Sequence, residues 1–332
     1  MTSASLAALL ALSFLFGCRP MDGTEVELGS AFSDGSPTAF LESVPIGPTR
    51  ALRLTRPAFT ATEVAQLTRS MGEVVTGESL LPAQVETLEA AAVEARARGT
   101  LEFGSEVVEF RYRPRQPSIL VGTVERVKPR FTEPGVYEGV GRGAALEAAQ
   151  VCADALAARE VIAARSYLRE PVLERAPGGR LPAHTKAIEN IENIESIKFV
   201  DHYHFVFGRV PDEVGILLGD AMLTIDVDAR TGDCFRIEAS FVDYVPAREV
   251  ELIVSVAAAR AAVEAIEAET GGARAVAGDG WILYSLDPGV AQAVVEPRYV
   301  DTYSVFSESG MATRSVGFAV TLSVAPPLIT EF

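Results

Sequence analysis

Strict two-residue alternation of apolar side chains is the feature that most constrains the fold of this chain. From residue 316 to residue 324, the even positions are apolar and the odd positions are small or polar. The same alternation recurs over residues 108–112, 223–227 and 235–241. Because successive side chains of a strand point to opposite faces, each segment is predicted to be a strand with one dry and one wet face. Such strands are typical of antiparallel sheets covered on one side only.

Helices are predicted next to these strands and could cover their dry faces. Thr60-Ala61-Thr62-Glu63 has the pattern of a capping box, residues 144–168 are rich in alanine, and Ser255 precedes a helical stretch at 256–269. Helices come before a group of strands three times along the chain. We therefore expect an α+β fold of tandem modules, each with a helix packed on its own antiparallel sheet. The expected boundaries are 42–130 for module 1, 135–246 for module 2 and 247–332 for module 3.

The N-terminus has the pattern of an exported lipoprotein. An apolar run at residues 6–16 is followed by Gly17-Cys18, and it is shorter than the roughly 20 residues that a spanning helix needs. Residues 1–17 are therefore predicted to be a signal peptide, although residues 1–5 contain no Lys or Arg. Cys18 would become the acylated first residue, and a plain secreted protein is the alternative. Small, polar and turn-forming residues predict a flexible tether over residues 18–41.

The charge of the chain limits the classes of partner. Twenty-nine Lys and Arg stand against 45 Asp and Glu, which gives a formal net charge of -16. A surface of this sign repels phosphate backbones and anionic headgroups, so nucleic acid is excluded as a partner. Attachment to the lipid bilayer would rest on the acyl groups of Cys18. Because Arg19 is not an aspartate of the inner-membrane retention type, we expect the protein at the bacterial outer membrane.

Two histidines are the candidate metal ligands, but they are weak ones. His202 and His204 should share one face of a strand and could bind zinc or copper if His184 or Asp220 supplied a third ligand. The opposite face of this strand is aromatic and is the natural core side. The sequence therefore favours two solvent-facing histidines, and we assign no metal site.

Other motifs also have simple structural interpretations. Asp226, Asp228 and Asp233 could line a calcium loop, but Arg230 stands where an oxygen ligand would be needed, so a hairpin turn is favoured. The glycine pattern at residues 139–144 opens a helix without a buried strand before it, which argues against a nucleotide site. The sequence has no recognisable hydrolase motif, and we assign no catalytic residue and no cofactor.

Cys152 and Cys234 are the cysteines that remain after Cys18. An exported protein meets an oxidising compartment, which favours a disulfide between them. Strand parity argues the other way, because Phe235 and Ile237 are expected to face the helix and Cys234 would then face outward. The sequence leaves both states open.

One region is similar in rhythm to a known family. An aromatic strand at residues 203–207, a short excursion, a strand ending in Asp228-x-x-Thr231-Gly232 and a return strand follow the helix predicted near residue 144. This order resembles that of PepSY and thermolysin-propeptide (FTP) modules. The resemblance implies a non-catalytic binding module, such as a peptidase inhibitor or a propeptide-like chaperone, with another envelope or secreted protein as its partner. A hydrolase whose site the sequence does not identify and a structural or assembly lipoprotein are the alternatives.

Overall fold

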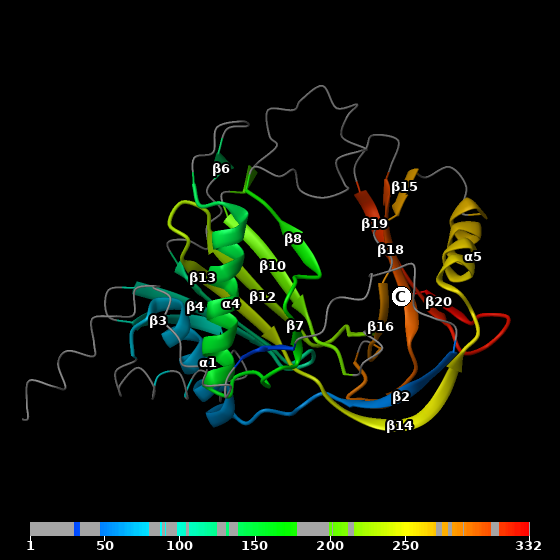
Figure 1. Cartoon of the computed structure of the whole chain (residues 1–332), viewed down its shortest axis with the longest axis horizontal. Helices are drawn as coiled ribbons and strands as arrows, with labels where there is room; N and C mark the ends of the chain where they lie inside the picture. Colours follow the sequence, from blue (N-terminus) through cyan, green and yellow to red (C-terminus); the bar gives the residue numbers. More distant parts are fainter. Residues whose placement is uncertain are drawn as a thin grey trace, which may run out of the picture.

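Two bodies, each with its own hydrophobic core, lie side by side and are bridged by the long strands β2 (Gly47–Thr55) and β14 (Asp243–Leu252) (Figure 1). The structure is a computed structural model. It describes residues 30–33, 47–79, 87, 90, 98–103, 106–124, 131–132, 139–177, 199–200, 202–211, 216–269, 274–277, 281–287, 289–306 and 312–331. Helices and mainly antiparallel strands make up these residues, so the fold belongs to the α+β class.

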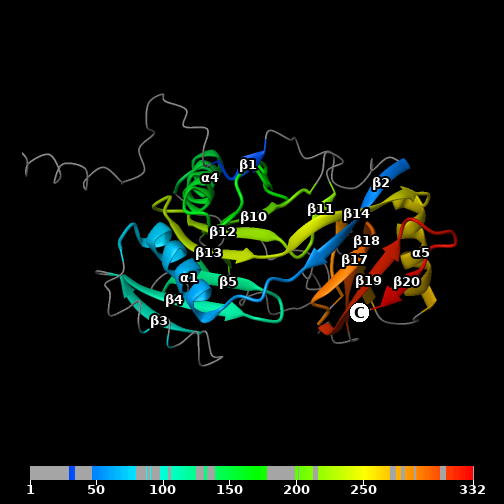
Figure 2. The same cartoon turned by 90° about the horizontal axis from the view of Figure 1, so that it is seen from below.

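The first body is built on a seven-stranded antiparallel sheet. Its strands, in spatial order, are β3 (Arg98–Phe103), β4 (Glu106–Arg113), β5 (Ser118–Thr123), β13 (Cys234–Ser240), β12 (Met222–Asp228), β10 (His202–Gly208) and β8 (Leu173–Arg175). Helices α1 (Ala61–Thr76) and α4 (Arg142–Ala158) both cover the same face of this sheet (Figures 1 and 2). The apolar residues of the sheet and of the two helices form the first core.

The start of α1 confirms the predicted capping box. The Thr60 hydroxyl accepts the backbone N–H of Glu63 at 3.3 Å, and the Glu63 carboxylate accepts the N–H of Thr60 at 2.7 Å. The helix ends at Gly77, whose φ of 71° suits a residue without a side chain. By contrast, α4 ends ten residues before the predicted end at 168, and Glu160 then turns the chain away with a φ of 56°.

The second body combines two sheets with α5 (Val256–Glu269). One sheet contains β11 (Leu217–Leu218), β16 (Trp281–Tyr284), β18 (Arg298–Phe306), β19 (Ala312–Thr321) and β20 (Ile329–Glu331), with β15 (Arg274–Ala277) also paired to β18. The other sheet has the order β14, β2 and β17 (Gln292–Val295). Ser255 caps α5 as predicted, because its hydroxyl accepts the N–H of Ala258 at 3.2 Å. A further short pair joins β6 (Phe131–Thr132) to β9 (Phe199–Val200).

The division into three modules with separate sheets does not describe this arrangement. Strand β5 lies in the range expected for module 1, yet it pairs with β13 from the expected module 2, so both ranges contribute to one sheet. Strand β2 also lies in the range expected for module 1, but it pairs with β14 and β17 in the second body. Alternation fixes which face of a strand is buried, but it does not say which strand lies beside it.

A short N-terminal segment packs into the first body, within the range predicted to be a flexible tether. β1 (Phe32–Ser33) pairs in parallel with β7 (Tyr167–Leu168), and the N–H of Ala31 donates to Asp154 Oδ1 at 2.8 Å. The Phe32 ring is buried and meets the Phe207 ring edge-on at 5.2 Å. The prediction of a tether over 18–41 is therefore wrong for residues 30–33, because Ala31 and Phe32 bury their apolar surface in the core. Cys18 lies outside the described residues.

Candidate functional site

The face of the seven-stranded sheet opposite the two helices is polar. On β10, the side chains of Tyr203, Phe205 and Phe207 point into the core, while His202 and His204 lie on the other face. This arrangement confirms the predicted parity of the strand. Both histidines are half-buried, however, with side chains only 18% and 21% exposed. They are therefore part of a packed polar cluster and do not extend freely into solvent.

The centre of this cluster is the buried carboxylate of Asp226. His204 and Arg236 are its direct register neighbours on β10 and β13. His204 Nδ1 donates to Asp226 Oδ1 at 2.6 Å, and one guanidinium nitrogen of Arg236 lies 3.3 Å from Oδ2. His202 Nε2 is 4.0 Å from the same Oδ2. These partners offset the cost of burying an aspartate whose side chain is only 1% exposed.

A β-bulge at the start of β13 completes the cluster and corrects two expectations. Ile237 faces Ile225 and Arg236 faces Asp226, but the next pair along joins Cys234 to Val227, so Phe235 is the extra residue. The Phe235 ring therefore packs against His202, at 5.3 Å between ring centroids, and does not belong to the core under the helices. Cys234, which the parity argument placed outside, points into that core.

Ion pairs extend from this cluster along β13. Arg236 lies 3.9 Å from Glu238 Oε2, and Glu238 Oε1 lies 3.5 Å from Arg113 at the end of β4. Asp226, Arg236, Glu238 and Arg113 thus alternate in sign across the sheet. The formal charges of the four side chains cancel, so the face is polar without carrying a large local charge.

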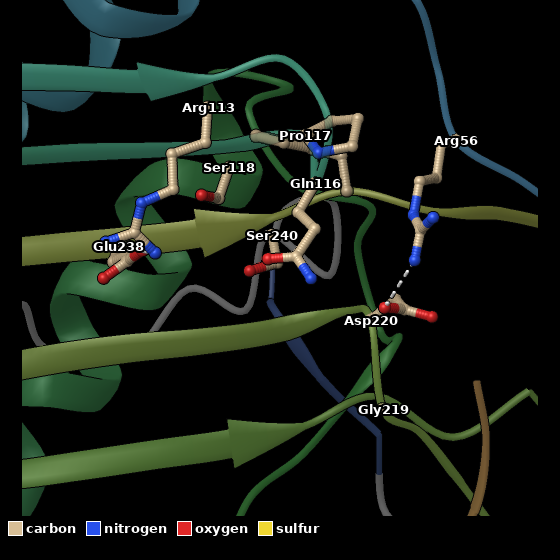
Figure 3. Close-up of a pocket in the computed structure, with 10 residues that line it drawn as sticks. Arg56, Arg113, Gln116, Pro117, Ser118, Gly219, Asp220, Glu238 and Ser240 are labelled. Carbon is tan, nitrogen blue, oxygen red and sulfur yellow. Dashed lines mark hydrogen bonds and ion pairs between the residues drawn. The ribbon is translucent and has the colours of Figure 1, made fainter. Parts of the chain in front are cut away.

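The charged row ends at a pocket of about 190 Å³ beside the junction of the two bodies (Figure 3). The first body supplies a wall from the turn between β4 and β5 and from the end of β13. The opposite wall comes from the loop before β12 and from the residue after β2. The main polar lining residues are Arg56, Arg113, Gln116, Ser118, Asp220, Glu238 and Ser240.

Arg56 and Asp220 form one wall of the pocket. Two of the Arg56 guanidinium nitrogens bind the carbonyl oxygens of Leu286, Asp287 and Val290, and one of them lies 3.3 Å from Asp220 Oδ1. The second oxygen of Asp220 accepts the N–H of Leu286 at 2.8 Å. Asp220 therefore links the loop before β12 to the loop after β16, and both of its carboxylate oxygens are engaged by these contacts.

The described candidate metal ligands do not form a common site. His184 lies outside the described residues, and Asp220 forms an ion pair with Arg56. Within the described ranges, no group of three His, Cys, Asp or Glu side chains has an arrangement that could hold a metal ion.

The aspartate-rich turn behaves as a hairpin turn. Asp228 Oδ1 accepts the backbone N–H groups of Arg230 and Thr231, and Gly232 has a φ of 80°. The Asp226 side chain lies instead in the polar cluster of the sheet, where it contacts His204 and Arg236, whereas Asp228 accepts backbone N–H groups of the turn.

Cys152 and Cys234 are not joined by a disulfide. The Cys234 thiol donates to the carbonyl oxygen of Ala148 at 3.3 Å, one helical turn before the half-buried Cys152. The inward position of Cys234 follows from the bulge, which shifts the parity of β13 by one residue.

Most residues of the pocket were not identified from the sequence. Glu238 and Ser240 occupy the wet positions of a predicted strand, so the alternation pattern contained a signal for them. Arg56 has no such signal, because its role depends on Asp220, which is 164 residues away in the sequence.

Comparisons with known proteins leave the family open. No protein-family model matches the sequence, and no curated protein matches it at a significant level. A solved structure of an uncharacterized protein from Eubacterium rectale matches 86% of this chain and 86% of its own chain, with 10% identity and a TM-score of 0.46. Among the helices that the structure describes, none is both long enough and apolar enough to cross a bilayer.

Proposed function

We propose that this protein is a lipoprotein of the bacterial envelope, anchored at the outer membrane through acylated Cys18, and that its folded part is a non-catalytic binding module. The apolar run before Gly17-Cys18 supports the anchor. Twelve residue steps separate Cys18 from Ser30, where the described fold begins. A chain of this length spans at most roughly 40 Å, so the module would stay close to the membrane surface.

The charge-paired polar face of the seven-stranded sheet is the observation that supports a binding role. Asp226 pairs with His204 and Arg236 on the two strands beside it, and Glu238 pairs with Arg113 on β4, two strands away. These contacts restrict the side chains before any partner arrives. A preorganised surface loses little conformational entropy on association, which favours affinity. We infer that this face binds another envelope or secreted protein, as a peptidase inhibitor or a propeptide-like chaperone would.

A hydrolase is the second candidate, and it has a specific observation in its favour. An imidazole held by a buried carboxylate, as in the His204–Asp226 pair, is an arrangement that general bases use. The nearby pocket also contains two carboxylates, those of Asp220 and Glu238. Both carboxylates are paired with arginines, and this pairing favours a structural and binding role for them.

The anchor is tested by the intact mass and the cell fraction of the protein. The wild-type mass should correspond to cleavage before Cys18 plus acyl groups, with the protein in the outer-membrane fraction. Cys18→Ala should remain unprocessed and leave that fraction, whereas Cys152→Ala should behave as the wild type. Cleavage at another residue would contradict the anchor.

The binding role is tested by affinity capture from the native envelope followed by mass spectrometry. The wild type should retain a specific protein, and Arg113→Ala, which breaks the pair with Glu238, should retain less of it. Arg69→Ala is the matched control, because Arg69 forms an ion pair with Glu73 on α1, away from this face. Turnover of a peptide, ester or glycoside substrate that Asp226→Asn abolishes would overturn the non-catalytic role and favour the hydrolase.

A further inference from the structure

Three polar side chains around the pocket have hydrogen-bonding capacity that the protein itself does not use. Ser118 and Ser240 are direct register partners on β5 and β13, and Gln116 lies in the turn before β5 (Figure 3). Within the described part of the chain, no hydrogen bond engages either hydroxyl or the Gln116 amide. Ser118 is only 5% exposed. The polar atoms of the three side chains are not among the described buried atoms that lack a partner, so they are accessible at the pocket. A ligand there can replace the water that hydrates these groups with direct hydrogen bonds.

The charges of the pocket favour a neutral ligand. Arg113 is paired with Glu238, and Arg56 is paired with Asp220, so the four charged side chains cancel formally. A charged ligand would gain no net attraction from these pairs, and the net charge of -16 would further oppose an anion. The available hydroxyls and the amide can each donate and accept, which matches a ligand with several hydroxyl groups.

The size and the remaining wall of the pocket narrow the ligand class. A volume of about 190 Å³ is below the 300–1,000 Å³ typical of sites for drug-sized ligands, so the pocket suits one small unit. Phe241 contributes apolar surface to the lining, which suits the C–H groups of a ring. We propose that this pocket binds a neutral saccharide unit through Gln116, Ser118 and Ser240. This inference goes beyond the binding of a protein partner and does not depend on the lipid anchor.

The inference is tested by calorimetric titration of the purified protein with neutral monosaccharides and disaccharides, including N-acetylated hexosamines. A uronic acid and a neutral blocked dipeptide serve as comparison ligands. We expect binding of at least one neutral saccharide. The double variant Ser118→Ala/Ser240→Ala should weaken that binding about tenfold or more, because both hydroxyls lose their contacts with the ligand. Ser166→Ala is the matched control, because the Ser166 hydroxyl donates to the Ala163 carbonyl outside the pocket, and it should bind as the wild type does.

Each result has a distinct meaning. Saccharide binding that survives the double serine change, with circular dichroism showing a folded protein, would overturn the assignment to this pocket. Preference for the uronic acid or the dipeptide, or no saccharide binding at all, would overturn the ligand class. Capture of an envelope protein in that case would leave the proposed binding role intact. Cleavage of a bound saccharide would support the ligand class and overturn the non-catalytic role.

Discussion

The hydrogen bond between His204 and Asp226 gives the sharpest prediction about stability, because the sequence alone predicts that His204→Ala is nearly neutral. In the structure, His204 Nδ1 donates at 2.6 Å to a carboxylate that is almost completely buried. Hydrogen bonds to charged groups contribute about 1.5–3 kcal/mol. Because the His204 side chain is 21% exposed, water can replace part of this contact, and we expect His204→Ala to lower the free energy of unfolding by about 1–2 kcal/mol.

A double-mutant cycle with Asp226→Asn isolates this contact from the neighbouring Arg236. Urea unfolding at neutral pH, followed by far-ultraviolet circular dichroism, should give a coupling energy of about 1–2 kcal/mol between the two positions. Trp281, the sole tryptophan of the sequence, lies on β16 in the second body, so its fluorescence reports separately on that body.

The matched control for the cycle is the ion pair of Arg69 and Glu73, which lie one turn apart on α1 at 2.9 Å. This pair lies on the helix surface, so its coupling energy should be below about 0.5 kcal/mol. If the His204–Asp226 coupling were equally small, the Asp226 carboxylate would be satisfied without His204, and our account of the cluster would be wrong.

Three further predictions follow from burial. Phe205→Ala should lower the free energy of unfolding in urea by about 3–5 kcal/mol, and Phe241→Ala by less, because Phe205 is fully buried and Phe241 only partly; equal losses would contradict this difference. Burial raises the pKa of Tyr167 to about 12, so from pH 10 to 12 the unfolded chain loses this proton while the folded chain keeps it. The free energy of unfolding should therefore fall as pH rises through this window, by at most about 3 kcal/mol. Urea unfolding at several pH values measures this fall, which should be smaller in Tyr167→Phe. A thiol reagent should label half-buried Cys152 faster than buried Cys234, as measured by mass spectrometry under native conditions. If neither cysteine is labelled and the protein mass is two hydrogens lower, the two cysteines form a disulfide instead.

The polar cluster shows where reasoning from the sequence succeeds and where it stops. Alternation placed His202 and His204 on the correct face of β10, because side-chain direction in a strand depends only on neighbouring residues. It failed at Phe235 and Cys234, where a bulge inserts one residue opposite the junction of Asp226 and Val227. A bulge depends on the pairing of two strands, so the sequence of one strand cannot reveal it.

Local signals determined the α+β class, the dry faces of the strands, the capped starts of α1 and α5 and the turn at Gly232. Each of these features depends on groups within a few residues along the chain. The tertiary structure decided that strands from two expected modules share one sheet, that Phe32 packs into the core, and that Arg56 meets Asp220 at the pocket. Because the entropic cost of closing a loop rises slowly with its length, distant segments compete with near ones for the same apolar faces, and only the complete packing selects among them.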